Sequence, residues 1–127
     1  MPTLDTNCLV RWLIRDDPAK TAQVEARLAS HRLLRVPDVA LIETVYVLES
    51  FYRLSRDEVG AAIRLLIGQS VLDFDRVLWS QVIGLYQDHP KLSCTDVYLS
   101  LDARRQSAEP LISLDRKLIN QLGAVSP

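Results

Sequence analysis

The sequence has few of the residues that break or cross-link a polypeptide chain. Four glycines, six prolines and no low-complexity tract argue against collagen-like, linker-rich and disordered chains. The two cysteines stand at positions 8 and 94 without CxxC spacing or a secretory signal, so a disulfide framework or a zinc site has no support. Because 48% of the 127 residues are apolar, we predict one folded domain over residues 1–127, in a reducing cytoplasm.

The chain also lacks a membrane-spanning run and an excess of charge. Its start, Met1-Pro2-Thr3, has no basic and apolar signal region, and the longest apolar runs fall far short of the ~20 residues of a membrane span. Lys and Arg number 15 against 16 Asp and Glu, for a net charge of -1, so there is no global field to hold a polyanion. Any nucleic-acid binding has to come from a local basic rim, which argues against wrapping of a duplex.

Short apolar runs alternate with longer segments of helical periodicity. Helices are predicted at residues 7–14, 18–30, 38–53, 55–69, 75–87, 95–107 and 115–122. Strands are predicted at residues 3–4, 33–36, 71–74, 111–114 and 124–125. Apolar strands that alternate with helices are typical of a parallel sheet covered on both faces, so the predicted fold class is α/β. Helices 38–53 and 55–69 are predicted to form an antiparallel hairpin.

Three aspartates stand where helices are predicted to begin. Asp5 and Asp115 each follow a predicted strand, and ligands of open parallel sheets bind beyond the carboxyl ends of the strands. Asp96 lies in the first turn of its helix, with Ser93 or Thr95 as a candidate cap. Asp is also a favoured helix cap, so each residue taken alone has a purely structural interpretation.

Glu43 is harder to explain as a surface residue. Its helical neighbours at three and four residues are Val39, Ala40, Tyr46 and Val47, all apolar. The spacing therefore predicts that this face is buried or lines a pocket. A carboxylate in an apolar patch is costly unless a cation or hydrogen bonds satisfy it, which favours a ligand role.

These four carboxylates are poorly matched with cations, since only Arg116 stands beside one of them. At a separation of about 5 Å and an effective dielectric of about 20, each pair of like charges would cost about 3 kcal/mol. A divalent cation removes that cost. Ligands that are all oxygen select Mg²⁺ or Mn²⁺ over zinc, and such an ion can activate water against a phosphodiester.

The order of short motifs resembles the PIN-domain ribonucleases, specifically the VapC toxins of bacterial toxin-antitoxin modules. The motifs that carry the resemblance are Asp5-Thr6-Asn7, Leu9-Val10-Arg11, Asp16-Asp17-Pro18, Pro37, Ile42-Glu43, Val45-Tyr46-Val47-Leu48, Thr95-Asp96 and Ser113-Leu114-Asp115. They cover nearly the whole chain. The departures are Leu114, where an aromatic residue is commonest, and Val97 in place of Ala, and both concern packing.

The resemblance implies a fold, an activity and partners. The fold is a PIN-like three-layer sandwich, with a central parallel sheet of about five strands flanked by helices. The activity is Mg²⁺-dependent endoribonuclease cleavage, with Mn²⁺ as a possible substitute, and the metal ligands and catalytic residues are Asp5, Glu43, Asp96 and Asp115. The partners are an RNA substrate, a second copy of the chain in a homodimer, and a VapB-type antitoxin. We expect the antitoxin to wrap the apolar helix surfaces around residues 41–52 and 59–67 and to bring a basic side chain toward the acids, with a homodimer surface as the alternative.

Supporting roles follow from position along the chain. Thr6 and Asn7 can hydrogen-bond a carboxylate, a metal-bound water or a phosphate, or can cap the first helix; Ser113 can orient a carboxylate or simply alternate in a strand. A basic rim for phosphates is predicted from Arg11, Arg15, Arg116 and Lys117, with exposed charge of no function as the alternative. His31 and His89 have no partner at metal or triad spacing and are expected to face solvent.

Two other function classes remain open at this point. A non-catalytic RNA- or protein-binding module could use the same fold, although it would have no use for mutually repelling carboxylates. A small-molecule Mg²⁺ phosphatase or a receiver-type phosphoacceptor domain needs a nucleophilic Asp with a Lys partner or a second Asp two residues later. Asp5 is followed at that distance by Asn7, which argues against this class.

Overall fold

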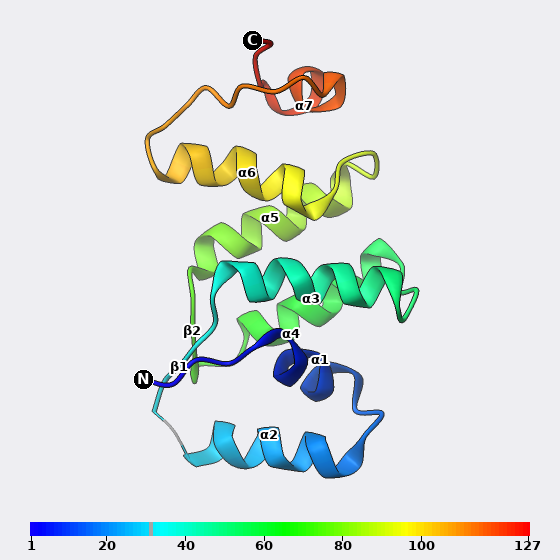
Figure 1. The fold of residues 1–127 in the computed structure, drawn as a ribbon, viewed down its shortest axis with the longest axis vertical. Coiled ribbons are helices and arrows are strands. Elements are labelled where there is room, and N and C mark those ends of the chain that lie inside the picture. Colours follow the sequence, from blue (N-terminus) through cyan, green and yellow to red (C-terminus); the bar gives the residue numbers. More distant parts are fainter. Residues whose placement is uncertain (31) are drawn as a thin grey trace. The chain divides into compact units, whose positions relative to one another are not determined.

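Helices make up most of the computed structural model, which describes residues 1–30 and 32–127 (Figure 1). Over these residues the helices are α1 (Thr6–Ile14), α2 (Pro18–Ser30), α3 (Asp38–Ser50), α4 (Arg56–Ile67), α5 (Arg76–Asp88), α6 (Cys94–Arg105) and α7 (Arg116–Leu122). Each corresponds to a predicted helix, with ends that differ by a few residues. None of the described helices is long and apolar enough to cross a membrane. Of the two histidines expected to face solvent, His31 lies outside the described residues. The Nδ1 atom of His89 lies 2.9 Å from the carbonyl oxygen of Leu85.

The predicted five-stranded sheet is not found in the described residues. Two strands, β1 (Leu34–Arg35) and β2 (Leu72–Asp73), pair in parallel, with Leu34 opposite Leu72. Thr3 forms an isolated parallel bridge with Arg35, and Ile112 forms another with Val125. All five predicted strand segments therefore pair in parallel, but in two separate groups and over very few residues.

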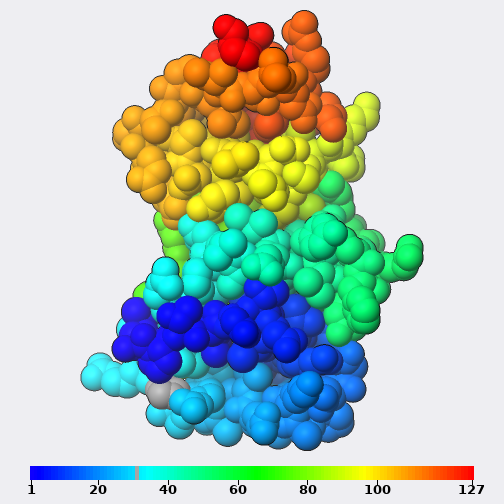
Figure 2. All heavy atoms as spheres, in the orientation of Figure 1, coloured from blue at the N-terminus to red at the C-terminus, as the bar shows by residue number. Residues whose placement is uncertain are grey.

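The chain forms two compact units, residues 1–75 and residues 76–127. In the first unit α1 lies between α2 and α3 and packs against both (Figures 1 and 2). Helix α3 packs against α4 to form the predicted hairpin. The apolar residues of the hairpin that recur at helical spacing are fully buried, at 0 to 1% exposure: Leu41, Val45, Leu48, Val59, Ile63 and Leu66. Most of the apolar surface predicted for a partner is thus core.

The second unit is built around α5 and α6, which pack against each other. Trp79 and Tyr86 of α5 are fully buried, and the Trp79 ring stacks on the ring of Tyr98 at a centroid distance of 5.7 Å. Helix α7 packs on α6 and follows the bridged segment around Ile112. The starts of α6 and α7 therefore belong to the second unit, whereas α1 and α3 belong to the first.

Candidate functional site

Asp5 is the N-cap of α1. Its Oδ1 atom accepts a hydrogen bond from the backbone N–H of Cys8 at 3.0 Å, and its side chain is exposed. The cap fixes the direction of this carboxylate at the point where the bridged segment at Thr3 gives way to the helix. The cap is therefore established, and a cap is compatible with metal ligation through the remaining lone pairs.

Glu43 lies on α3 and is exposed, so of the two alternatives predicted for its face, burial or a pocket, burial is not found. Val39 and Tyr46 are 61% and 67% exposed, whereas Ala40 is buried. The reason is that α3 is apolar nearly all round, so periodicity alone could not tell which side faces the core. The expectation of a pocket is confirmed: Glu43 lines a cavity of about 340 Å³.

The residues around this cavity come from two helices and the segment after α3. They are Thr6, Asn7, Val10, Arg11, Glu43, Val47, Phe51 and Tyr52. Thr6 and Asn7 do not supply the side-chain cap of α1, because Asp5 does; they lie instead beside Glu43. The first unit thus brings Thr6 and Asn7, which follow Asp5 in the chain, and Glu43 to the lining of one pocket.

Asp96 is the third residue of α6 and takes part in a capping box. Its backbone N–H donates to Ser93 Oγ at 3.1 Å, and the Ser93 N–H donates to Asp96 Oδ2 at 3.2 Å. Of the two candidate caps, Ser93 is therefore the one used. The Asp96 side chain is half-buried.

Asp115 is the N-cap of α7. Its Oδ1 atom accepts from the backbone N–H of Lys117 at 2.9 Å, and the Lys117 Nζ atom lies 4.0 Å from Oδ2. Ser113 Oγ accepts from the backbone N–H of Asp115 at 3.0 Å. Ser113 therefore positions the backbone of Asp115, and not its carboxylate.

The four predicted ligands are divided between the two units. Asp5 and Glu43 belong to residues 1–75, and Asp96 and Asp115 to residues 76–127. Over residues 1–30 and 32–127, no group of three or more His, Cys, Asp or Glu side chains is placed to hold a metal ion. A four-carboxylate site therefore stays a prediction.

The chemistry of the donors fits a hard divalent cation. All four side chains offer only carboxylate oxygens, which suit Mg²⁺ or Mn²⁺ and not zinc. Glu43 makes no hydrogen bond or ion pair within the described part of the chain, so its carboxylate is open to a ligand.

Most of the predicted basic rim is already paired with acids. Arg11 Nη1 lies 3.0 Å from Asp16 Oδ1, and Arg15 Nη2 lies 2.6 Å from Glu25 Oε1. The Arg15 guanidinium also lies over the Trp12 ring, 5.5 Å from its centroid. Lys117 pairs with Asp115, as described above, and Arg116 is exposed in the first turn of α7. These pairs lower the positive charge that Arg11, Arg15 and Lys117 can offer to phosphates.

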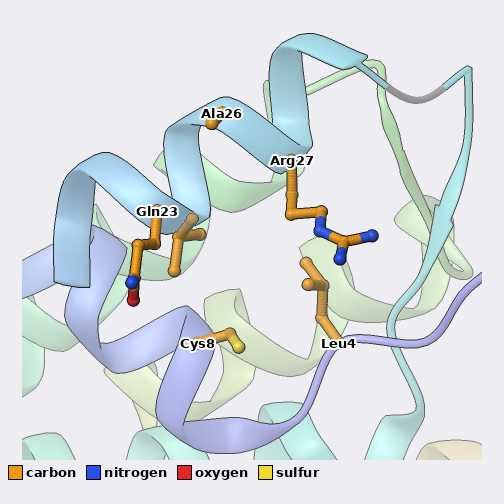
Figure 3. Close-up of a pocket in the computed structure, with 6 residues that line it drawn as sticks. Leu4, Cys8, Gln23, Ala26 and Arg27 are labelled. Atoms are coloured by element: carbon orange, nitrogen blue, oxygen red, sulfur yellow. The ribbon is translucent and has the colours of Figure 1, made fainter.

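A second cavity, of about 490 Å³, adjoins the Asp5 segment on the side of α2. It is lined by Leu4, Cys8, Gln23, Val24, Ala26 and Arg27. Figure 3 shows the Arg27 side chain extending from α2 toward Leu4. Partial burial, followed by the hydrogen bond and the charge of Asp5, raises the pKa of the Cys8 thiol above its ordinary value of 9.0. No acid lines this cavity, so it is not a candidate metal site.

The sequence pattern did not predict the contacts of Tyr52 and Arg11, which line the same cavity as Glu43. Tyr52 O–H donates to Asp16 Oδ2 at 3.1 Å, and the other oxygen of Asp16 accepts from Arg11. Phe51 packs on Tyr52 in a T-shaped pair, with ring centroids 4.9 Å apart. In the sequence, Tyr52 is only a residue at the end of an apolar helical segment. That position does not identify Asp16, 36 residues away, as its hydrogen-bond partner.

Comparison with known proteins identifies one family. The PIN domain matches residues 3–123, which includes both compact units and all four predicted ligands. No curated protein matches the sequence. An α/β chain with parallel strand pairing is consistent with a PIN-like fold, and PIN domains are generally nucleases, which supports a hydrolase activity. Since the match spans nearly the whole chain, this protein belongs to the PIN domain family.

Proposed function

We propose that this protein is a metal-dependent endoribonuclease and the toxin component of a type II, VapBC-like toxin-antitoxin system. The observation that carries the proposal is that the family match spans Asp5, Glu43, Asp96 and Asp115, and that none of these carboxylates is fully buried. Three of these acids also cap helices, and Asp115 pairs with Lys117, whereas Glu43 has neither role in the part of the chain that the structure describes. Carboxylates that water can reach are good ligands for a hard cation.

The residues of the chain have separable tasks in this mechanism. Asp5, Glu43, Asp96 and Asp115 would hold Mg²⁺ or Mn²⁺, which when bound lowers the pKa of a water and neutralises phosphodiester charge. The caps at Asp5 and Asp115 fix the direction of two of the four carboxylates before any ligand arrives. The Thr6 hydroxyl and the Asn7 amide, beside Glu43, can hydrogen-bond the RNA strand. The exposed Arg116 and the adjacent Lys117, with Arg11 and Arg15, would contribute the basic rim.

The proposed partners are an RNA substrate, a VapB-type antitoxin and a second copy of the chain. After the core of the hairpin is accounted for, the apolar side chains that remain exposed on it are Val39, Tyr46, Phe51 and Leu65, at 57 to 75% exposure. An antitoxin or a dimer partner would cover part of this surface. Expression alone should then slow growth, and co-expression with the adjoining reading frame should restore it.

The activity is tested by RNA cleavage with purified protein. We expect cleavage in Mg²⁺ or Mn²⁺ that stops in excess EDTA. Asp5→Asn, Asp96→Asn and Asp115→Asn should each abolish it, whereas Glu43→Gln should keep some activity if Glu43 binds through water. Asp17→Asn is the matched control, because Asp17 caps α2 and is no predicted ligand. Cleavage that is equal with chelator present would refute metal dependence. RNA binding without cleavage in any divalent cation would support the alternative, a non-catalytic binding module.

A further inference from the structure

The cavity beside Glu43 combines four kinds of chemistry in one place. Its lining includes a hydroxyl and an amide from Thr6 and Asn7, a guanidinium from Arg11, and the aromatic rings of Phe51 and Tyr52. Its volume of about 340 Å³ lies within the range of small-ligand pockets, about 300 to 1,000 Å³. The pocket can therefore accept a group of the size of one nucleotide.

Phe51 is the most exposed aromatic side chain on this surface, at 75%. It follows the last residue of α3, and its ring forms a T-shaped pair with the Tyr52 ring at an interplanar angle of 74°. A large apolar ring left exposed in the lining of a pocket that also holds polar groups is a feature of binding surfaces.

Tyr52, on which the Phe51 ring packs, belongs to a network that joins three segments of the first unit. Tyr52 O–H donates to Asp16 Oδ2 at 3.1 Å, and Arg11 Nη1 donates to Asp16 Oδ1 at 3.0 Å. The Arg11 side chain is only 26% exposed, and its Nε atom is buried without a hydrogen-bond partner among the described residues. Arg11 is thus packed against the pocket and does not extend into solvent. The Tyr52 ring that supports Phe51 is thus positioned before a ligand arrives, which lowers the entropy cost of binding.

We propose that Phe51 is a stacking platform for one unpaired nucleobase of the RNA substrate. The inference rests on the proposed function, because it places the stacked base next to Glu43. Bases inside a duplex have both faces covered, so they cannot stack on a side chain. A purely apolar peptide side chain would leave Asn7, Thr6 and Glu43 without partners, which favours a nucleotide as the occupant.

The test measures binding and fluorescence with a short fluorescently labelled single-stranded RNA and its duplex. Ca²⁺ replaces Mg²⁺, and a gel checks that the strand stays intact. The variants are Phe51→Leu, which keeps an apolar side chain without a ring, and Phe51→Trp, which keeps the ring. Leu65→Ala is the control, because Leu65 is 57% exposed on α4 and does not line the pocket. Thermal melts establish that each variant is folded.

We expect Phe51→Leu to bind the single strand about 5- to 150-fold more weakly, the range measured for loss of one stacked base. Phe51→Trp and Leu65→Ala should bind like the wild type, and the added tryptophan should be quenched by the single strand and not by the duplex. The platform is refuted if Phe51→Leu binds the single strand like the wild type, if the duplex binds equally well, or if the added tryptophan is not quenched. Any of these results would leave a protein as the occupant of this surface. If cleavage in Mg²⁺ or Mn²⁺ persists in the same samples, the proposed function survives that result. If the wild type neither binds nor cuts RNA, both fail.

Discussion

Replacing Asp115 by Asn separates a metal ligand from a helix cap, because the two roles respond differently to the loss of charge. An Asn side-chain oxygen can still accept the Lys117 N–H that Asp115 Oδ1 accepts at 2.9 Å. The Lys117 Nζ–Asp115 Oδ2 pair is long, at 4.0 Å, and half-exposed, so its loss costs little. Without metal we therefore expect a destabilisation below about 0.5 kcal/mol. A gain in stability would report relief of repulsion among converging acids.

With Mn²⁺ bound, the wild type and Asp115→Asn should differ clearly in stability. At a Mn²⁺ concentration ten times its Kd, binding stabilises the wild type by about 1.4 kcal/mol, which follows from mass action. For a chain of this length that corresponds to a rise in Tm of about 4 to 7 °C. Asp115→Asn should lose most of this rise, because an amide is a weaker ligand for a hard cation than a carboxylate.

The sequence offers a closely matched control in Asp17. Its Oδ1 atom accepts from the Lys20 N–H at 3.1 Å, and Lys20 Nζ lies 3.9 Å from its Oδ2. The two aspartate side chains are 34% and 33% exposed, so their local environments are nearly the same. Asp17→Asn should keep the full Mn²⁺ shift. Calorimetric melts of the three proteins, in EDTA and in Mn²⁺ at constant ionic strength, decide the matter. An absent shift in the wild type, or an equal shift in Asp115→Asn, would refute the ligand role.

The Arg11–Asp16–Tyr52 network makes two further predictions. Asp16→Ala should destabilise the fold by about 1 to 2 kcal/mol in urea unfolding, because it removes the partner of the largely buried Arg11. Glu25→Ala should cost under about 0.5 kcal/mol, since the side chains of its pair with Arg15 are 50% and 47% exposed. Equal costs would contradict this reasoning. Desolvation, followed by the hydrogen bond and charge of Asp16, raises the pKa of Tyr52 above its ordinary value of 10.0. The contribution of this shift to the free energy of unfolding is present below pH 10.0 and is lost as the pH rises through the raised pKa. In an ultraviolet titration of phenolate, Asp16→Asn should make one tyrosine ionise at a lower pH than in the wild type, because it removes the charge beside Tyr52.

The starts of the helices could be predicted from the sequence because they depend on contacts within four residues. Asp17 before Pro18, and Asp115 at the start of α7, cap their helices through backbone N–H groups two or three residues later. The buried face of α4 followed in the same way from the spacing of Val59, Ile63 and Leu66. Such features need no knowledge of the rest of the chain.

The side that α3 presents to solvent was decided by tertiary structure. Its apolar residues surround the helix, so only the positions of α1 and α4 determine that Leu41 is buried and that Tyr46 and Glu43 are exposed. Strand length is a second case, because a strand depends on hydrogen-bond partners that are far away in sequence. The segment at Thr3 pairs with Arg35 for a single bridge only, although its composition allowed more.

Residue types and their order in the sequence identified the four acids and the family, because carboxylate chemistry and motif spacing are properties of the chain itself. The pocket that Glu43 shares with Phe51 was not accessible in that way. It depends on Asp16, from the loop after α1, meeting Tyr52, from the segment after α3, at 3.1 Å. A hydrogen bond between residues 36 positions apart exists only when the path of the intervening loops and helices brings the two atoms together, and that path is set by packing of the whole unit.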